Sequence, residues 1–236
     1  MMTPDTHPSL ADQAYQRLRQ KIFDFELMPG DRISESDLAR KVQLGRTPLR
    51  QALLRLSYDG FVESLPKVGW QVAAIDFDKI DELYDFRILI ECDAVRRLCA
   101  ATNSHPAVAE LEAIWANPPF GRTFDGVDVG VMDERFHQRL VSAAGNAEML
   151  RVHSEITDRI RLVRRLDFTK RHRIDDTYRE HALVLRAIAR RRTAEAADIL
   201  NAHIEQSKAE VRNITLGMMQ QARKPQFNVD PYSRQG

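Results

Sequence analysis

Apolar residues recur at helical spacing in the first part of the chain. They predict a first helix that begins after Ser9, because Asp12 three residues later completes a capping-box pattern. The apolar positions that support this helix at i, i+4, i+8 and i+12 are Leu10, Ala14, Leu18 and Ile22. Pro29 and Gly30 end the first element, and a short second helix is expected over 34–42.

A third helix is expected to start at Thr47-Pro48 and to run to about Asp59. Threonine is a good N-cap, and proline is favoured at the first helical position. Its apolar face carries Leu49, Leu53 and Leu56. Residues 61–75 then read as two short strands around a turn, which predicts a β-hairpin. Three helices with such a hairpin indicate a winged helix-turn-helix domain.

Beyond residue 78 the pattern predicts only helices. The expected ranges are 78–101, 106–116, 129–144, 146–166, 173–190 and 194–221. A loop rich in proline and glycine is expected over 117–130. The fold class is therefore mainly α: a winged helix-turn-helix domain over 1–75, an all-α antiparallel bundle over 76–222, and a mobile C-terminal tail over 223–236.

We expect a cytoplasmic protein. None of the apolar runs among the 236 residues reaches the length of a membrane helix, and the N-terminus has no signal-peptide pattern. Cys92 and Cys99 lie seven residues apart on one helical pattern, so they are expected to be reduced and partly buried.

Basic residues gather where the third helix and the hairpin are expected. Residues 40–67 contain six bases and two acids, against a net charge of +1 for the chain. The exposed face of the third helix would carry Arg46, Thr47, Arg50 and Gln51, with Lys67 and Gly69 at the hairpin tip. Arginine can make two hydrogen bonds to guanine in the major groove, so these six residues are candidate DNA contacts.

The segment "DERFHQRLVSAAGN", residues 133–146, raises a separate question. Asp133 and His137 are four residues apart and therefore share one face of a helix. Taken alone, the pair fits a metal site, a catalytic pair, or a surface acid beside a core histidine, and the last is the commonest. The spacing does not choose among them.

The segment "GDRISESDLARKVQLGRTPLRQALLRLSYDGFVESLPKVGWQVA" resembles the DNA-binding domain of GntR-family bacterial transcriptional regulators. The resemblance assigns DNA contacts to Arg46, Thr47 and Arg50 and the wing glycine to Gly69. Ser36 and Gly45 depart from the family pattern, which bears on the operator sequence. It implies a homodimer on a palindromic double-stranded DNA operator, and a regulator rather than an enzyme.

The second half resembles the FCD domain of the FadR-type branch of that family. The matching segments are "LYDFRILIECDAVRRLCA", "DERFHQRLVSAAGN", "REHALVLRAIARR" and "ILNAHIEQS". The resemblance implies four ligands for a divalent ion: Asp133, His137, His181 and His203. Three imidazoles and one carboxylate suit Zn²⁺ or Ni²⁺. A small carboxylate effector is then expected at the ion, with Arg87 and the arginines at 159–165 as its further partners.

Three alternatives stay open from the residues. The ion could only brace the bundle, the protein could sense metal without an organic effector, or the cluster could serve a metallo-hydrolase. For the last, Glu134 and Glu180 are poor bases, because they adjoin the ligand positions and are expected on other helix faces. Glu91 is a possible base, but it is typical of the non-catalytic family. The histidines outside the ligand set are read as surface residues: His7, His105, His153 and His172.

Overall fold

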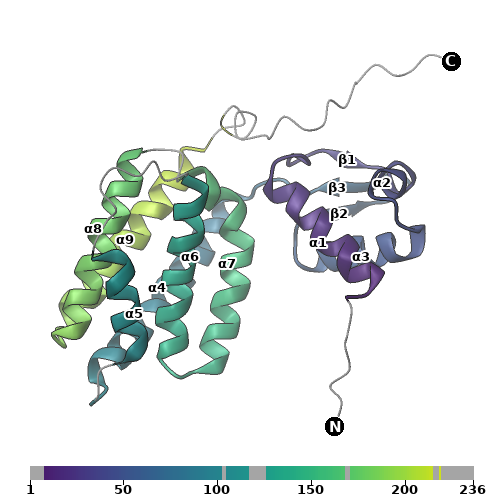
Figure 1. Ribbon diagram of the computed structural model, residues 1–236. Helices are drawn as coiled ribbons and strands as arrows, with labels where there is room; N and C mark the ends of the chain where they lie inside the picture. Colours follow the sequence, from purple (N-terminus) through teal and green to yellow (C-terminus); the bar gives the residue numbers. More distant parts are fainter. Residues whose placement is uncertain (1–7, 103–104, 117–125, 168–170, 215–217, 219–236) are drawn as a thin grey trace, which may run out of the picture. The chain divides into compact units, whose positions relative to one another are not determined.

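The computed structural model describes residues 8–102, 105–116, 126–167, 171–214 and 218, within which the chain forms two compact units. The first unit ends at Ile75, and the second spans Asp76–Ile214. The tail expected over 223–236 lies outside the described residues. Figure 1 shows a small α/β unit and an all-helical unit, which are described separately below.

Three helices form most of the first unit: α1 (Leu10–Phe23), α2 (Glu35–Val42) and α3 (Arg46–Tyr58). The predicted capping box at Ser9 and Asp12 is present, and Ser34 caps α2 by accepting from the Asp37 amide. Helices α1 and α3 pack together over a core of fully buried leucines, which are Leu18, Leu49, Leu53 and Leu56. Burial of this apolar face stabilises the unit.

The third helix begins earlier than the sequence suggested. Gly45 is the N-cap of α3, in extended conformation, and its carbonyl accepts from the Leu49 amide at 3.3 Å. Thr47 is therefore already helical, so its expected role as the N-cap is wrong. No side chain caps the first turn, which leaves the amides of Arg46 and its neighbours available to a phosphate.

The wing is a three-stranded antiparallel sheet with the order β1-β3-β2. Strands β2 (Val62–Leu65) and β3 (Gly69–Val72) form the predicted hairpin. Strand β1 (Arg32–Ile33) was not predicted, because two residues are too few to show alternation. Gly69 has φ +118°, and a Cβ there would lie 3.2 Å from the Ile33 carbonyl oxygen, so the position requires glycine.

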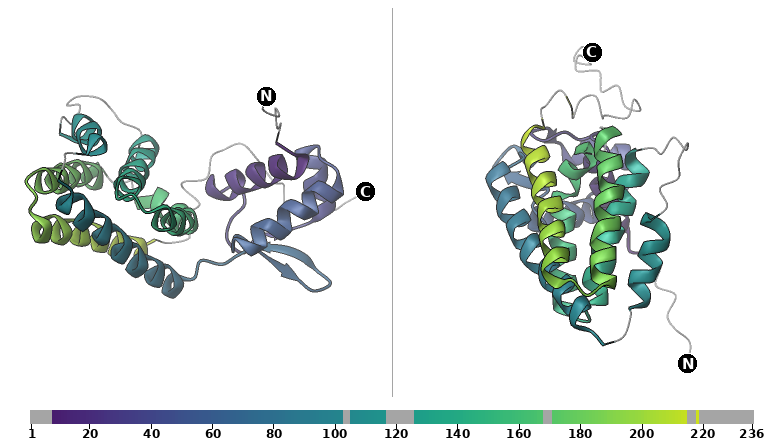
Figure 2. Two further views of the ribbon diagram at one scale, coloured as in Figure 1. Left: turned by 90° about the horizontal axis from the view of Figure 1, so that it is seen from below. Right: turned by 90° about the vertical axis from the view of Figure 1, so that its left-hand side faces the viewer.

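The second unit is a bundle of six helices within the described residues (Figures 1 and 2). They are α4 (Phe77–Ala100), α5 (Pro106–Trp115), α6 (Gly126–Ala143), α7 (Ala147–Asp167), α8 (Arg171–Ala189) and α9 (Thr193–Arg212). Helix α4 packs against α6, α7 and α9, and α8 packs against α5 and α9. The predicted helices are present, but α9 ends at Arg212 rather than near residue 221.

The interior of this bundle is unusually polar. Burial of polar and charged groups is costly unless they are paired, so such a concentration indicates a site rather than a packed core. The polar side chains with at most 6% exposure are Arg87, Glu91, Asp133, His137, His153, Thr157, Arg164, Arg173, Thr177, His181, His203 and Ser207.

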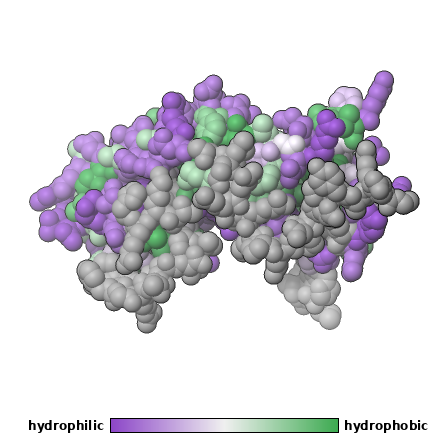
Figure 3. Space-filling model, turned by 90° about the horizontal axis from the view of Figure 1, so that it is seen from above, coloured by the Kyte–Doolittle hydropathy of each residue, from purple (hydrophilic) through white to green (hydrophobic). Residues whose placement is uncertain are grey.

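The outside of the described residues is mostly hydrophilic in the view of Figure 3, where hydrophobic residues form separate patches. None of the described helices is long and apolar enough to cross a membrane.

Candidate metal centre and DNA-reading face

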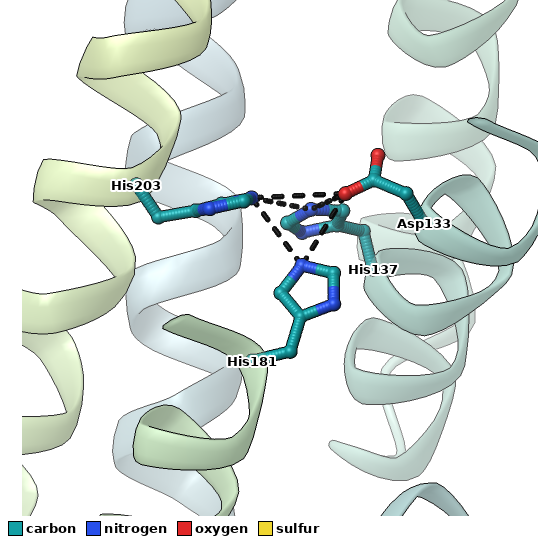
Figure 4. Close-up of side chains that lie close together, drawn as sticks. All are labelled: Asp133, His137, His181 and His203. Atoms are coloured by element: carbon teal, nitrogen blue, oxygen red, sulfur yellow. Dashed lines mark hydrogen bonds and ion pairs between the residues drawn. The ribbon is translucent and has the colours of Figure 1, made fainter. Parts of the chain in front are cut away.

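Four buried side chains from three helices converge inside the bundle (Figure 4). Asp133 and His137 come from α6, His181 from α8 and His203 from α9. One ligand atom from each lies within 4.8 Å of the other three. The i, i+4 spacing places the aspartate and the first histidine on one face of α6, and the packing of α8 on α9 brings the other two rings to it.

The donor atoms are spaced as a single ion would require. Nε2 of His203 lies 3.3 Å from Nε2 of both His137 and His181. Asp133 Oδ1 lies 3.5 Å, 3.3 Å and 3.8 Å from Nε2 of His137, His181 and His203. Bonds of about 2.0–2.1 Å to a tetrahedral ion would separate its ligand atoms by about 3.3 Å. Asp133 Oδ1 has no hydrogen-bond partner among the described residues, so a cation would satisfy it.

Two carboxylates fix the orientation of two of the rings. His137 Nδ1 lies 2.5 Å from Glu91 Oε2, and His203 Nδ1 lies 2.6 Å from Glu180 Oε2. An ionised carboxylate can only accept, so each Nδ1 carries the proton and each Nε2 presents its lone pair to the centre. Two lone pairs 3.3 Å apart repel unless a cation lies between them. This carboxylate–histidine arrangement is typical of metal ligands.

Aromatic rings rather than a carboxylate hold His181. Its ring stacks on Phe136, with centroids 3.6 Å apart and planes at 8°, and meets the edge of Trp115 at 4.3 Å. Its Nδ1 is buried without a hydrogen-bond partner among the described residues. Packing therefore sets the direction of its Nε2.

The cluster is neutral at its histidines. Burial lowers the pKa of His137, and for His181 and His203 burial and the neighbouring histidines together hold the pKa well below its ordinary value. For Glu91, burial alone would raise the pKa, but Arg87 and His137 hold it well below its usual range. Neutral imidazoles are the state in which histidine binds metal.

Buried arginines surround the acids of the site. Arg87 Nε donates to Glu91 Oε1 at 2.5 Å, and its Nη2 has no hydrogen-bond partner among the described residues. Arg164 donates to Asp133 Oδ2 and Arg173 to Glu180 Oε2. Arg87 and the 159–165 segment were anticipated from the sequence; Arg173 was not.

Two expectations about residues near the site are wrong. His153 is fully buried, and its Nε2 lies 2.9 Å from Glu91 Oε1, so it is not a surface residue. Glu180 does not point away from the cluster, because it contacts His203. The burial of His153 could have been predicted from the apolar residues Ile156 and Ile160, which share its face of α7. His105 is partly exposed before α5, whereas the side chains of His7 and His172 lie outside the described part of the chain.

The first unit presents the predicted DNA-contact residues. All four candidates on α3 are exposed, on the side opposite the buried leucines: Arg46, Thr47, Arg50 and Gln51. Lys67 is exposed at the tip of the wing, two residues before β3 begins. Within the first unit, these polar side chains of the first two turns of α3 and the wing tip lie at the surface.

A winged helix-turn-helix unit followed by a helical unit with a buried polar site defines a DNA-binding regulator with an effector domain. Family models agree: "Bacterial regulatory proteins, gntR family" matches residues 10–72, and "FCD domain" matches residues 82–206. The chain belongs to the GntR family of bacterial transcriptional regulators and carries an FCD domain.

Similar proteins are also regulators. The Nta operon transcriptional regulator of Aminobacter aminovorans is 29% identical over 193 residues, covering 82% of this chain and 90% of that protein. The gluconate operon transcriptional repressor of Bacillus subtilis is 25% identical over 92% of this chain and 90% of its own length. A putative GntR regulator from Rhodococcus sp. RHA1 shares the fold, with a TM-score of 0.71 and 24% identity over 88% of this chain and all of that one. The expectation of a regulator rather than an enzyme is confirmed.

Proposed function

We propose that this regulator binds a palindromic operator as a homodimer, and that a small organic acid at a metal site in the FCD domain controls its affinity for DNA. It would act in the cytoplasm, where its operator is. The observation that carries the proposal is the convergence of three imidazole nitrogens and one carboxylate oxygen in a buried site. One relative represses a gluconate operon, and gluconate is a small hydroxy carboxylate.

On the DNA side, the exposed face of α3 would enter the major groove. Arg46 and Arg50 would read base edges, and Thr47 and Gln51 would add contacts to bases or phosphates. The wing would contact the backbone or minor groove through Lys67, with Gly69 beside it at the tip of the hairpin. The exposure of these side chains supports the assignment.

In the FCD domain, the residues that would hold the ion are Asp133, His137, His181 and His203. Zn²⁺ and Ni²⁺ fit this donor set best. The ion would supply a positively charged position for one oxygen of a carboxylate. Glu91 and Glu180 keep two rings in the ligating tautomer, and Arg164 holds the second oxygen of Asp133.

Arg87 is suited to bind the same acid. Its Nε is used by Glu91, whereas its Nη2 is buried and lacks a hydrogen-bond partner among the described residues. A buried guanidinium N–H without an acceptor is costly, and an incoming carboxylate would remove that cost. Binding could shift the regulator between DNA-binding and released states only if the acid prefers one of them.

A metal sensor without organic effector is the second candidate, because four protein ligands can hold an ion by themselves. A thermal-shift screen separates the two. Small mono- and dicarboxylates are added to Zn²⁺-loaded and chelator-treated protein, and fluorescence anisotropy on a selected operator follows DNA binding. An acid that raises Tm only with metal present, and changes DNA affinity, supports the proposal. If metal stabilises and no acid adds to it, the site is structural or metal-sensing.

A further inference from the structure

The inner face of α7 carries polar side chains that the metal site does not use. His153 and Thr157 are one helical turn apart and are 0% and 1% exposed. Arg164, two turns after Thr157, donates to Asp133, and His153 contacts Glu91, which also binds His137. At a rise of about 1.5 Å per residue, Thr157 lies about 6 Å along the helix from His153. The row therefore contacts residues of the site near both of its ends, Glu91 through His153 and Asp133 through Arg164.

In this row, His153 has a ring nitrogen, Nδ1, that is a hydrogen-bond acceptor without a donor. Its Nε2 donates to the Glu91 carboxylate at 2.9 Å, because that carboxylate can only accept. In the neutral ring, Nδ1 then has a lone pair and no proton. This atom is buried and has no hydrogen-bond partner within the described ranges.

Thr157 and Arg87 supply the complementary groups. Thr157 Oγ1 is buried without a partner among the described residues, although a hydroxyl can both donate and accept. Arg87 Nη2 is a hydrogen-bond donor that is also buried without a partner among the described residues. Arg87 Nε and His153 Nε2 both donate to one oxygen, Glu91 Oε1. Unpaired polar atoms are rare in protein interiors. Two of these three belong to residues that share Glu91 Oε1, and the third lies one turn along α7 from His153, so together they indicate a missing polar ligand.

We infer that the effector is a hydroxy acid, and that His153 and Thr157 recognise its hydroxyl. The inference rests on the proposed function, in which Arg87 and the ion bind the carboxylate. A carboxylate alone can only accept, so it satisfies Arg87 but not His153 Nδ1. A ligand hydroxyl donates to His153 Nδ1 and accepts from Thr157, which leaves none of the three atoms unpaired. An aliphatic acid of the same length would leave two of them buried and unpaired.

The test compares acids that differ by one hydroxyl on the full, Zn²⁺-loaded chain. Calorimetric titrations use the pairs propionate and lactate, butyrate and 3-hydroxybutyrate, and succinate and malate. We expect at least one hydroxylated member to bind about tenfold or more tightly than its partner, because a site with unpaired polar atoms rejects the analogue that lacks the hydroxyl.

Thr157→Val removes the hydroxyl at nearly constant volume. It should reduce that preference to within about threefold, through weaker binding of the hydroxylated acid alone. Thr177→Val is the matched control: Thr177 is equally buried, but its hydroxyl donates to the Arg173 carbonyl at 2.8 Å, so the preference should persist.

The outcomes separate this inference from the proposed function. If no acid binds the metal-loaded protein, the proposed function fails. If acids bind but none of the pairs shows a preference, or if Thr157→Val leaves a preference intact, the proposed function stands and the hydroxyl-recognition role is overturned.

Discussion

Replacement of Glu180 by glutamine should weaken metal binding although Glu180 is not a ligand. Its Oε2 lies 2.6 Å from His203 Nδ1 and 3.0 Å from Arg173. The amide keeps the shape and still accepts a hydrogen bond, but it loses the charge that makes the ring a stronger ligand. Loss of such a partner costs 10- to 100-fold in metal affinity, which is about 1.4–2.7 kcal/mol. Competition titration with a chromophoric Zn²⁺ chelator measures the change.

Glu134→Gln is the matched control for that experiment. Glu134 also adjoins a ligand position, also pairs with an arginine, and has similar side-chain exposure, 20% against 22% for Glu180. It bonds Arg161 and none of the cluster histidines. Its replacement should leave Zn²⁺ affinity within about threefold. Equal losses in both variants, or full affinity in Glu180→Gln, would refute the role of Glu180.

Two further predictions concern DNA and pH. Arg50→Ala should reduce the preference for operator over random DNA by about 1–3 kcal/mol in anisotropy titrations, whereas Lys67→Ala should weaken binding to both alike; an unchanged preference would exclude Arg50 from base reading. In metal-free protein the pKa of His181 and His203 lies well below the ordinary 6.5. The unfolded chain therefore binds more protons below that pH. The free energy of unfolding should be level above about pH 6.5 and decrease on acidification by up to about 1.4 kcal/mol per histidine per pH unit, and Tm should fall with it. A Tm that rises between pH 6.5 and 5.5 would contradict this reasoning.

Periodicity and caps predicted most of the fold because those signals are local. Ser9 with Asp12 and the leucine face of α3 are examples in which a few neighbouring residues determine the helix. Strand β1 could not be found in this way, since it exists only by pairing with β3. The start of α3 was misplaced because Thr47-Pro48 is a strong local signal, whereas the backbone turns into the helix at Gly45.

The candidate site, too, depends on contacts between distant segments, which local sequence signals do not show. The four ligand positions came from resemblance, and their convergence is a property of three helices that no spacing along the chain encodes. His153 and Glu180 were misread because each was judged from its immediate neighbours. Their partners, Glu91 and His203, lie 62 and 23 residues away.

The most direct measurement is the Zn²⁺ content of the full chain after chelation, reloading and dialysis, determined by mass spectrometry of the metal. We expect about one ion per wild-type chain and a large loss in His181→Gln, which removes one ligand at similar volume. His105→Gln, outside the cluster, should keep the ion. A wild-type chain that retains no metal, or a His181→Gln chain that retains all of it, would contradict a metal centre formed by Asp133, His137, His181 and His203.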